Sequence, residues 1–182
     1  MRTAVLVLTV TLAGCSADAP GPDETAAPSP VEIPCEASVG RDDADAATWV
    51  IVDAAVALPS PDLPALQVVE LTGPVGDPDA DIEGWWWAKH GLLVAGGSLV
   101  ELAVPREHDA DVRIGWGMPA TPAVRVIIDC ELAGDSWAAF AGGYWVREPG
   151  CYPIDVRVDG GPARSVDLGI GAPCPGQAPP PW

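Results

Sequence analysis

The chain has 182 residues, and its 26 Asp and Glu against 9 Lys and Arg give a formal net charge of −17. Such an acidic protein is repelled by phosphate and gains none of the counterion-release free energy on which nucleic-acid binding depends, so nucleic acid is excluded as a partner. No window offers the roughly 20 uninterrupted apolar residues of a membrane-spanning helix, and the length suits one domain with one core.

The first predicted element is an export signal. Arg2 is followed by an apolar stretch, Ala4 to Leu12, and then by Leu12-Ala13-Gly14-Cys15. This tetrapeptide resembles the bacterial lipobox, in which the cysteine thiol receives a diacylglycerol and the peptide before it is removed. The resemblance implies a signal peptide over residues 1–14, lipidation at Cys15, and a protein anchored on the outer side of the cell membrane by its acyl chains.

A proline-rich tether is expected next, over residues 15–34, which contain Pro20, Pro22, Pro28, Pro30 and Pro34. Proline favours an extended polyproline conformation, so this segment would hold a domain away from the membrane. Residues 175–182 form a second proline-rich stretch and are expected to be a tail. The folded domain is therefore predicted to span residues 35–174.

Within this domain the dominant pattern is short β-branched runs separated by Gly and Pro. These runs predict strands over residues 49–52, 67–71, 98–104, 111–116, 124–130, 143–146, 152–158 and 165–170. A helix is expected only around residues 42–47, where Asp43 is a candidate cap for an alanine-rich turn. In the last pair of strands, Asp159-Gly160-Gly161 supplies the tight turn of a hairpin. The whole pattern predicts an all-β, antiparallel β-sandwich.

The segment from Gly142 to Tyr152 resembles the late corner and hairpin of immunoglobulin-like β-sandwich domains. Pro149-Gly150 corresponds to the turn and Tyr152 to the corner tyrosine, and the resemblance covers roughly residues 98–174. The chain is also similar to small lipoproteins of high-GC Gram-positive bacteria. It departs from antibody domains because Tyr152 follows Cys151 directly instead of preceding it by two residues, so the disulfide between sheets is not carried over.

Four cysteines remain once Cys15 is set aside: Cys35, Cys130, Cys151 and Cys174. An even number of cysteines in an exported chain predicts disulfides, and three pairings are possible. Because an antiparallel strand that ends at one end of a sandwich restarts nearby, we favour Cys130 with Cys151. That choice leaves Cys35 to pair with Cys174.

Sequence patterns of catalytic and cofactor sites are weak or absent. The histidines, His90 and His108, are too distant from any cysteine in sequence for a recognisable zinc site. A blue-copper site is disfavoured because neither His nor Met follows Cys151. Ser136 lies in a Gly-Asp-Ser sequence, but Trp137 occupies the place of the glycine expected after a chymotrypsin-like nucleophile. We therefore expect no cofactor and no enzymatic activity.

One acidic loop is a weak candidate for a calcium site. Its carboxylates alternate along the chain and comprise Asp77, Asp79, Asp81 and Glu83. Oxygen ligands of this kind suit calcium, but the loop lacks the glycine and the closing glutamate of an EF-hand. A solvated loop between strands is the favoured interpretation.

Three consecutive tryptophans follow this loop. Because side chains alternate along a strand, Trp85 and Trp87 would share one face and Trp86 would occupy the other. Core packing is the favoured interpretation, and the alternative is an exposed platform in which Trp85 and Trp87 bind a sugar or a protein partner. The sequence thus predicts an envelope binding or structural module. A glycan-binding domain, an accessory subunit of an envelope protein and an unrecognised enzyme remain alternatives.

Overall fold

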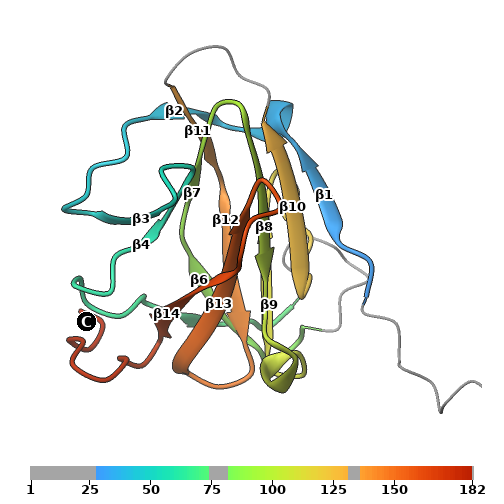
Figure 1. The fold of residues 1–182 in the computed structure, drawn as a ribbon. Coiled ribbons are helices and arrows are strands. Elements are labelled where there is room, and N and C mark those ends of the chain that lie inside the picture. The colour runs from blue at the N-terminus through green and yellow to red at the C-terminus, as the bar shows by residue number, and fades with distance from the viewer. Residues whose placement is uncertain (1–27, 74–81, 131–135, 182) are drawn as a thin grey trace, which may run out of the picture.

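A computed structural model describes residues 28–73, 82–130 and 136–181. Their strands form a mainly antiparallel, all-β sandwich, which confirms the predicted all-β sandwich class (Figure 1). Among these residues, no helix has the length and apolarity required to cross a bilayer. The lipobox and Cys15 lie outside the described residues.

One layer of the sandwich is a five-stranded sheet, sheet A, with the order β1-β10-β8-β13-β14. Its strands are β1 (Val31–Pro34), β8 (Ser98–Ala103), β10 (Arg125–Cys130), β13 (Gly150–Val158) and β14 (Arg164–Ile170). β1 pairs in parallel with β10, and the other neighbours pair antiparallel. β13 and β14 form the predicted hairpin, with Asp159 and Gly160 at positive φ in its turn.

The other layer consists of two sheets, one of five strands and one of four. Sheet B has the order β2-β11-β7-β4-β3, with β2 (Gly40–Asp42), β3 (Trp49–Val52), β4 (Val56–Pro59), β7 (Leu92–Ala95) and β11 (Trp137–Phe140). Sheet C has the order β5-β6-β12-β9, with β5 (Val69–Glu70), β6 (Trp86–Lys89), β9 (Val112–Trp116) and β12 (Gly142–Val146). Only His90 and Gly91 separate β6 from β7, and only Ala141 separates β11 from β12, so the chain continues directly from one sheet to the other.

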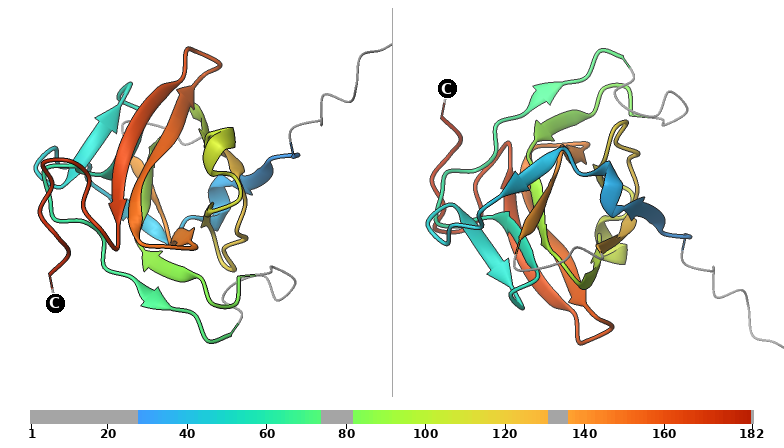
Figure 2. Two further views of the ribbon diagram at one scale, coloured as in Figure 1. Left: turned by 90° about the horizontal axis from the view of Figure 1, so that it is seen from below. Right: turned by 90° about the horizontal axis from the view of Figure 1, so that it is seen from above.

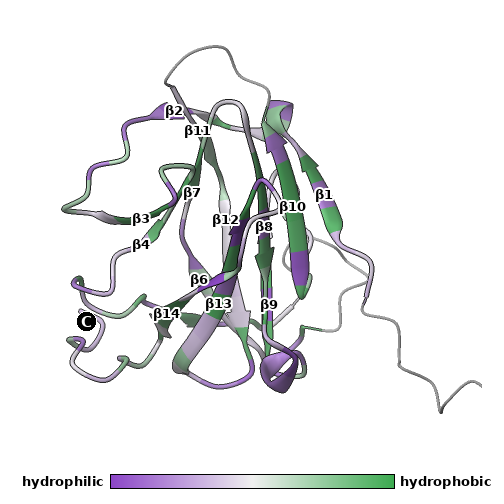
Figure 3. Ribbon diagram, in the orientation of Figure 1, coloured by the Kyte–Doolittle hydropathy of each residue, from purple (hydrophilic) through white to green (hydrophobic). Residues whose placement is uncertain are grey.

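All three sheets contribute to one hydrophobic core. Val100 and Ile154 of sheet A, Leu92 of sheet B, and Ile114 and Tyr144 of sheet C are fully buried in it. End-on views show the strands surrounding this interior (Figure 2). Burial alternates along β10, as a strand with one face on the core requires: Val126, Ile128 and Cys130 are buried, and Arg125, Ile127 and Asp129 are not. The middle of β10 is hydrophobic, and hydrophilic residues lie near its ends (Figure 3).

The predicted corner tyrosine makes a local hydrogen bond. The hydroxyl of Tyr152, near the start of β13, donates to the carbonyl oxygen of Glu148 at 2.8 Å; Glu148 lies four residues upstream and just before β13. Partial burial, with the nearby carboxylates of Asp111 and Glu148, raises the pKa of this hydroxyl. The group therefore stays protonated and remains a donor across the neutral pH range.

The four cysteines form two disulfides, but the favoured pairing is wrong. Cys35 pairs with Cys130, and Cys151 pairs with Cys174. Cys35 follows β1 directly, and the parallel pairing of β1 with β10 brings it beside Cys130 at the end of β10. The inference from antiparallel strands failed because it placed residues 31–34 in the tether rather than in a strand.

Two other predictions about the N-terminal part are corrected. The expected helix around residues 42–47 is absent, because aspartate side chains there bond to nearby backbone: Asp42 accepts from the amide of Asp43, and Asp45 from the amide of Ala47. The last residues of the expected tether form β1, whose Ile33 is 5% exposed. The described helical structure consists of two 3-10 turns, η1 (Cys35–Ala37) and η2 (Arg106–His108).

Candidate functional site

The outer face of sheet C carries a small hydrophobic cluster, which we call the tryptophan cluster. Its buried members are Leu71, Ile82, Trp85 and Trp145, and Trp87 and Ala120 pack against them. Trp87 pairs directly with Trp145 across β6 and β12, and their rings stack with centroids 6.4 Å apart. Trp85 is only 3% exposed, so it does not present an open ring face to a ligand.

Two arginines cover Trp85. The guanidinium carbon of Arg147 lies 4.7 Å from the centroid of the Trp85 ring, and that of Arg113 lies 5.5 Å from it. Burial lowers the pKa of Arg113, and the neighbouring positive charge of Arg147 acts in the same direction. Both guanidinium groups therefore lie against an aromatic ring, whose quadrupole stabilises their positive charge.

The tryptophan cluster contains unsatisfied donors. The indole nitrogens of Trp87 and Trp145 are buried and have no hydrogen-bond partner among the described residues. Burying a polar group without a partner costs free energy, so these two N–H groups oppose the hydrophobic gain of the cluster.

Trp86 lies on the opposite face of β6, toward the main core, and it forms one wall of a groove of about 450 Å³. We call this the Trp86 groove. It is lined by Gln67, Val68, Val69, Trp86, Pro149, Gly171, Pro180 and Pro181. All of these residues are uncharged, although the chain as a whole is strongly acidic. The groove therefore suits an apolar group.

Close backbone packing shapes the groove beside Trp86. Gly171 has a φ of 73°, and a Cβ atom at this position would lie 2.8 Å from side-chain atoms of both Val68 and Pro149. Only glycine accommodates both the left-handed conformation and this approach. The absence of a side chain at residue 171 therefore lets the segments that carry Val68 and Pro149 meet.

The expected tail forms another wall of the groove. The disulfide from Cys151 to Cys174 fixes its start, and the Gln177 side chain joins two segments by accepting from the amide of Cys174 and donating to the carbonyl of Leu63. The amide of Ala65 donates to the carbonyl of Ala178, and the Gln67 side chain donates to the carbonyl of Pro181. Residues 174–181, which we call the strap, are thus docked on the domain.

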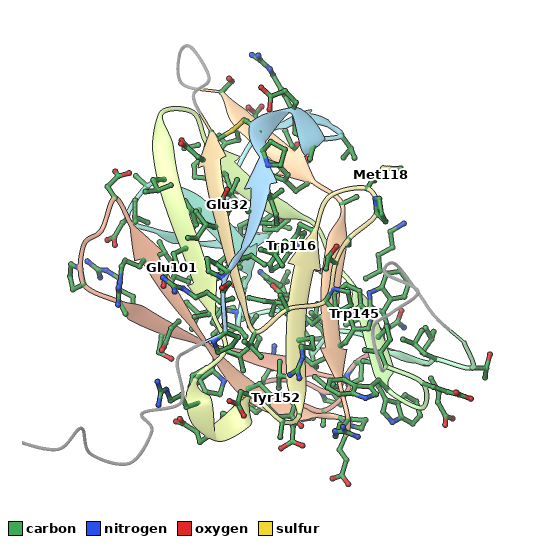
Figure 4. The ribbon with its side chains drawn as sticks, turned by 90° about the vertical axis from the view of Figure 1, so that its right-hand side faces the viewer. Glu32, Glu101, Trp116, Met118, Trp145 and Tyr152 are labelled. Carbon is green, nitrogen blue, oxygen red and sulfur yellow. A yellow bond between two sulfur atoms is a disulfide. The ribbon has the colours of Figure 1, made fainter. Side chains whose placement is uncertain are left out.

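Residues considered for other chemistry do not assemble into a site. Ser136 accepts a hydrogen bond from Arg41, while the His90 ring contacts Trp49 and the His108 ring contacts Tyr152. Met118 is 77% exposed at the periphery of the molecule, whereas Trp116 lies within it (Figure 4).

Within the described ranges, no group of three or more His, Cys, Asp or Glu residues is arranged to hold a metal ion. Of the calcium candidates, Asp77, Asp79 and Asp81 lie outside the described residues, and Glu83 is exposed.

A second, larger depression of about 880 Å³ lies along β1, η1 and β10. Its charged lining residues are Glu32, Glu36 and Asp129, all of them acidic. We favour the Trp86 groove as the candidate site because an aromatic wall and an uncharged lining provide the apolar contact on which ligand pockets usually depend.

No protein-family model, curated protein or solved structure matches this chain. The candidate site therefore depends on its geometry alone. The sequence predicts Trp85 and Trp87 as binding candidates, whereas the groove contains Trp86. The sequence predicts a tail over residues 175–182, and its one polar side chain, Gln177, makes hydrogen bonds that dock the strap.

Proposed function

We propose that this protein is a lipid-anchored binding module of the cell envelope, and that the Trp86 groove is its binding site. The observation that carries the proposal is the uncharged groove between Trp86, Pro149 and the strap. Anchoring is supported by the Leu12-Ala13-Gly14-Cys15 sequence, and an immunoglobulin-like origin by the hydrogen bond of Tyr152.

The positions of the anchor and the groove fit this role. β1, which follows the tether, and the C-terminal strap lie on opposite sides of the sandwich in each view (Figures 1 and 2). A domain tethered through β1 would present the strap and the Trp86 groove away from its point of attachment. Such an orientation leaves the groove accessible to a partner in the envelope.

A glycan is the second candidate ligand. The structure removes Trp85 as a stacking platform because its ring is buried under two arginines. Trp86 beside the amide of Gln67 retains the combination of an aromatic surface and a hydrogen-bonding group that sugar recognition uses.

The anchor is tested with Cys15→Ser. This variant should leave the membrane fraction and fail to incorporate radiolabelled fatty acid, because it lacks the thiol that receives the lipid. Retention of the variant on membranes after a high-salt wash would contradict lipid anchoring at Cys15.

The binding site is tested by photo-cross-linking in intact cells. Pro181 lines the groove and is exposed, whereas Val39 is also exposed and is not among the residues that line it, so the two positions form a matched pair. p-Benzoylphenylalanine at Pro181 should give a discrete cross-linked product that is absent from the Val39 variant. Equal products at both positions, or none at Pro181, would contradict the assignment of the groove.

A further inference from the structure

The Trp86 groove lies beside an open sheet edge. β5 is an outer strand of sheet C, and within the described part of the chain it pairs with β6 alone. Val69 faces Trp87 in this ladder, and Glu70 faces Trp86. Among the described residues, nothing pairs with the other side of β5. An edge strand of this kind is a template for the addition of another strand.

The ladder determines which backbone groups of this edge are free. The amide of Leu71 donates to Trp85, and the carbonyl of Leu71 accepts from Gly84, so both backbone groups of Leu71 point toward the β6 side. Backbone direction alternates along a strand, so Val69 also points toward β6, while Val68 and Glu70 point outward. No backbone hydrogen bond of Val68 is recorded with the described residues.

The residues of this edge whose backbone groups are free are also those whose side chains lie on the groove face. Val68 lines the groove, and Glu70 shares the face of Trp86, its partner in the ladder. In an antiparallel pairing, the residues opposite Val68 and Glu70 exchange hydrogen bonds with them and direct their side chains to this same face. An added strand would therefore use one set of alternate residues for both backbone pairing and groove contact.

Charge restricts the strand that fits here. The groove is uncharged, but Glu70 is exposed on β5 and Glu148 is exposed next to Pro149, a groove residue. A partner with an apolar side chain for the groove and a Lys or Arg beside it complements both features. An acidic partner would be repelled by these carboxylates and by the net charge of −17.

We propose that the protein binds an extended peptide segment of a partner, which adds as an antiparallel strand to β5 and places apolar side chains, flanked by a basic one, in the Trp86 groove. This inference rests on the proposed function, because it names the ligand class of the same groove. Main-chain pairing gives such a complex its affinity, and the groove gives it selectivity for alternate side chains.

The probe is a fluorescent nonapeptide in which threonine alternates with valine, and lysine replaces the last valine. Two N-methylated versions carry the methyl groups either on the valines or on the threonines. Each N-methyl group removes one backbone donor. Because valine faces the groove in the proposed register, methylation of the valines should weaken binding at least about tenfold, and methylation of the threonines should leave it nearly unchanged. Equal effects of the two methylated peptides would contradict strand addition.

Substitutions at Glu70 test the contribution of β5 to the same pairing. Glu70→Pro removes an outward N–H without removing a bond to β6, and it should weaken binding of the unmethylated probe by about tenfold. Glu70→Gln removes only the charge and should weaken binding about twofold to fivefold at low salt. If Glu70→Pro fails to fold, the two methylated peptides still decide the question on the wild-type protein.

Failure of this inference is distinguishable from failure of the proposed function. If the nonapeptide does not bind but muropeptide fragments of peptidoglycan shift the Trp86 indole resonance, the groove is a binding site for glycans and the peptide proposal is overturned. If neither probe binds and the Pro181 cross-linker gives no product, both proposals are overturned.

Discussion

The consecutive tryptophans Trp85 and Trp86 lie on opposite faces of sheet C and have different surroundings. Trp85 is buried in the tryptophan cluster beneath Arg113 and Arg147, whereas Trp86, the next residue, lines a groove with one side of its ring toward the core. A single step along the chain thus separates a residue that stabilises the fold from one that is available to a ligand. Composition alone does not distinguish them, because the assignment depends on what covers each face of β6.

Replacing Trp85 and Trp86 separately tests this comparison, and Trp85→Ala is expected to have the largest effect on stability of the variants considered. Trp85→Ala should lower the free energy of unfolding by about 3–5 kcal/mol, the range for a buried aromatic ring, as measured by urea denaturation. Trp86→Ala, the matched control, should lower it less because Trp86 is only partly buried. Equal losses of stability in the two variants would remove the distinction between the faces.

The strap disulfide gives the next largest effect. Cys151 and Cys174 are separated by 23 residues, and replacing both with serine should lower stability by about 3 kcal/mol. Hydrogen exchange should accelerate at the amide of Ala65, which the strap carbonyl of Ala178 protects, and not within the tryptophan cluster. Uniform acceleration throughout the domain would show that the strap is not a separate docked element.

A smaller effect is expected from the cation above Trp85. Arg147→Met keeps much of the aliphatic stem but removes the charge and the hydrogen bond that Nε donates to the carbonyl of Ala110, and it should lower stability by about 0.5–1 kcal/mol. Arg157 is exposed and lies over no aromatic ring of the described residues, so Arg157→Met provides the matched control. If the two variants lose equal stability, the contact with the Trp85 ring contributes nothing specific.

The pH dependence of stability should show a still smaller effect at His90. Burial lowers the pKa of His90 below 6.5, and this outweighs the hydrogen bond with the carbonyl of Gly91. The unfolded state therefore binds the proton more readily, so this part of the stability is complete above pH 6.5 and is lost as pH falls. The Tm of His90→Gln should decrease less between pH 7.5 and pH 5.5 than that of the wild type. An equal decrease would exclude His90 as the cause.

The sequence predicted the elements that depend on local alternation. Ile154 and Val156 point inward from β13 as expected, and Asp159 and Gly160 turn the hairpin to β14. The strands that were missed are short or atypical in composition. β11 contains two alanines and two aromatic residues, and β2 has Gly, Arg and Asp, so neither resembles a β-branched run.

The candidate site was less predictable because it is assembled from distant segments. Val68, Trp86, Gly171 and Pro181 meet only after the sheets have packed and the strap has docked. Alternation correctly placed Trp85 and Trp87 on a different face from Trp86, but it gave no information on which face would be covered. The disulfide pairing failed for a related reason, since it required the parallel neighbour relation of β1 and β10.

The most direct test of the central claim is an NMR titration that follows the indole N–H signals of all tryptophans. With the threonine-valine nonapeptide or with muropeptide fragments, the account predicts that the Trp86 signal shifts with ligand concentration while those of Trp85 and Trp145 stay in place. A titration in which Trp85 or Trp145 shifts and Trp86 does not would move the binding site to the outer face of sheet C and contradict the account.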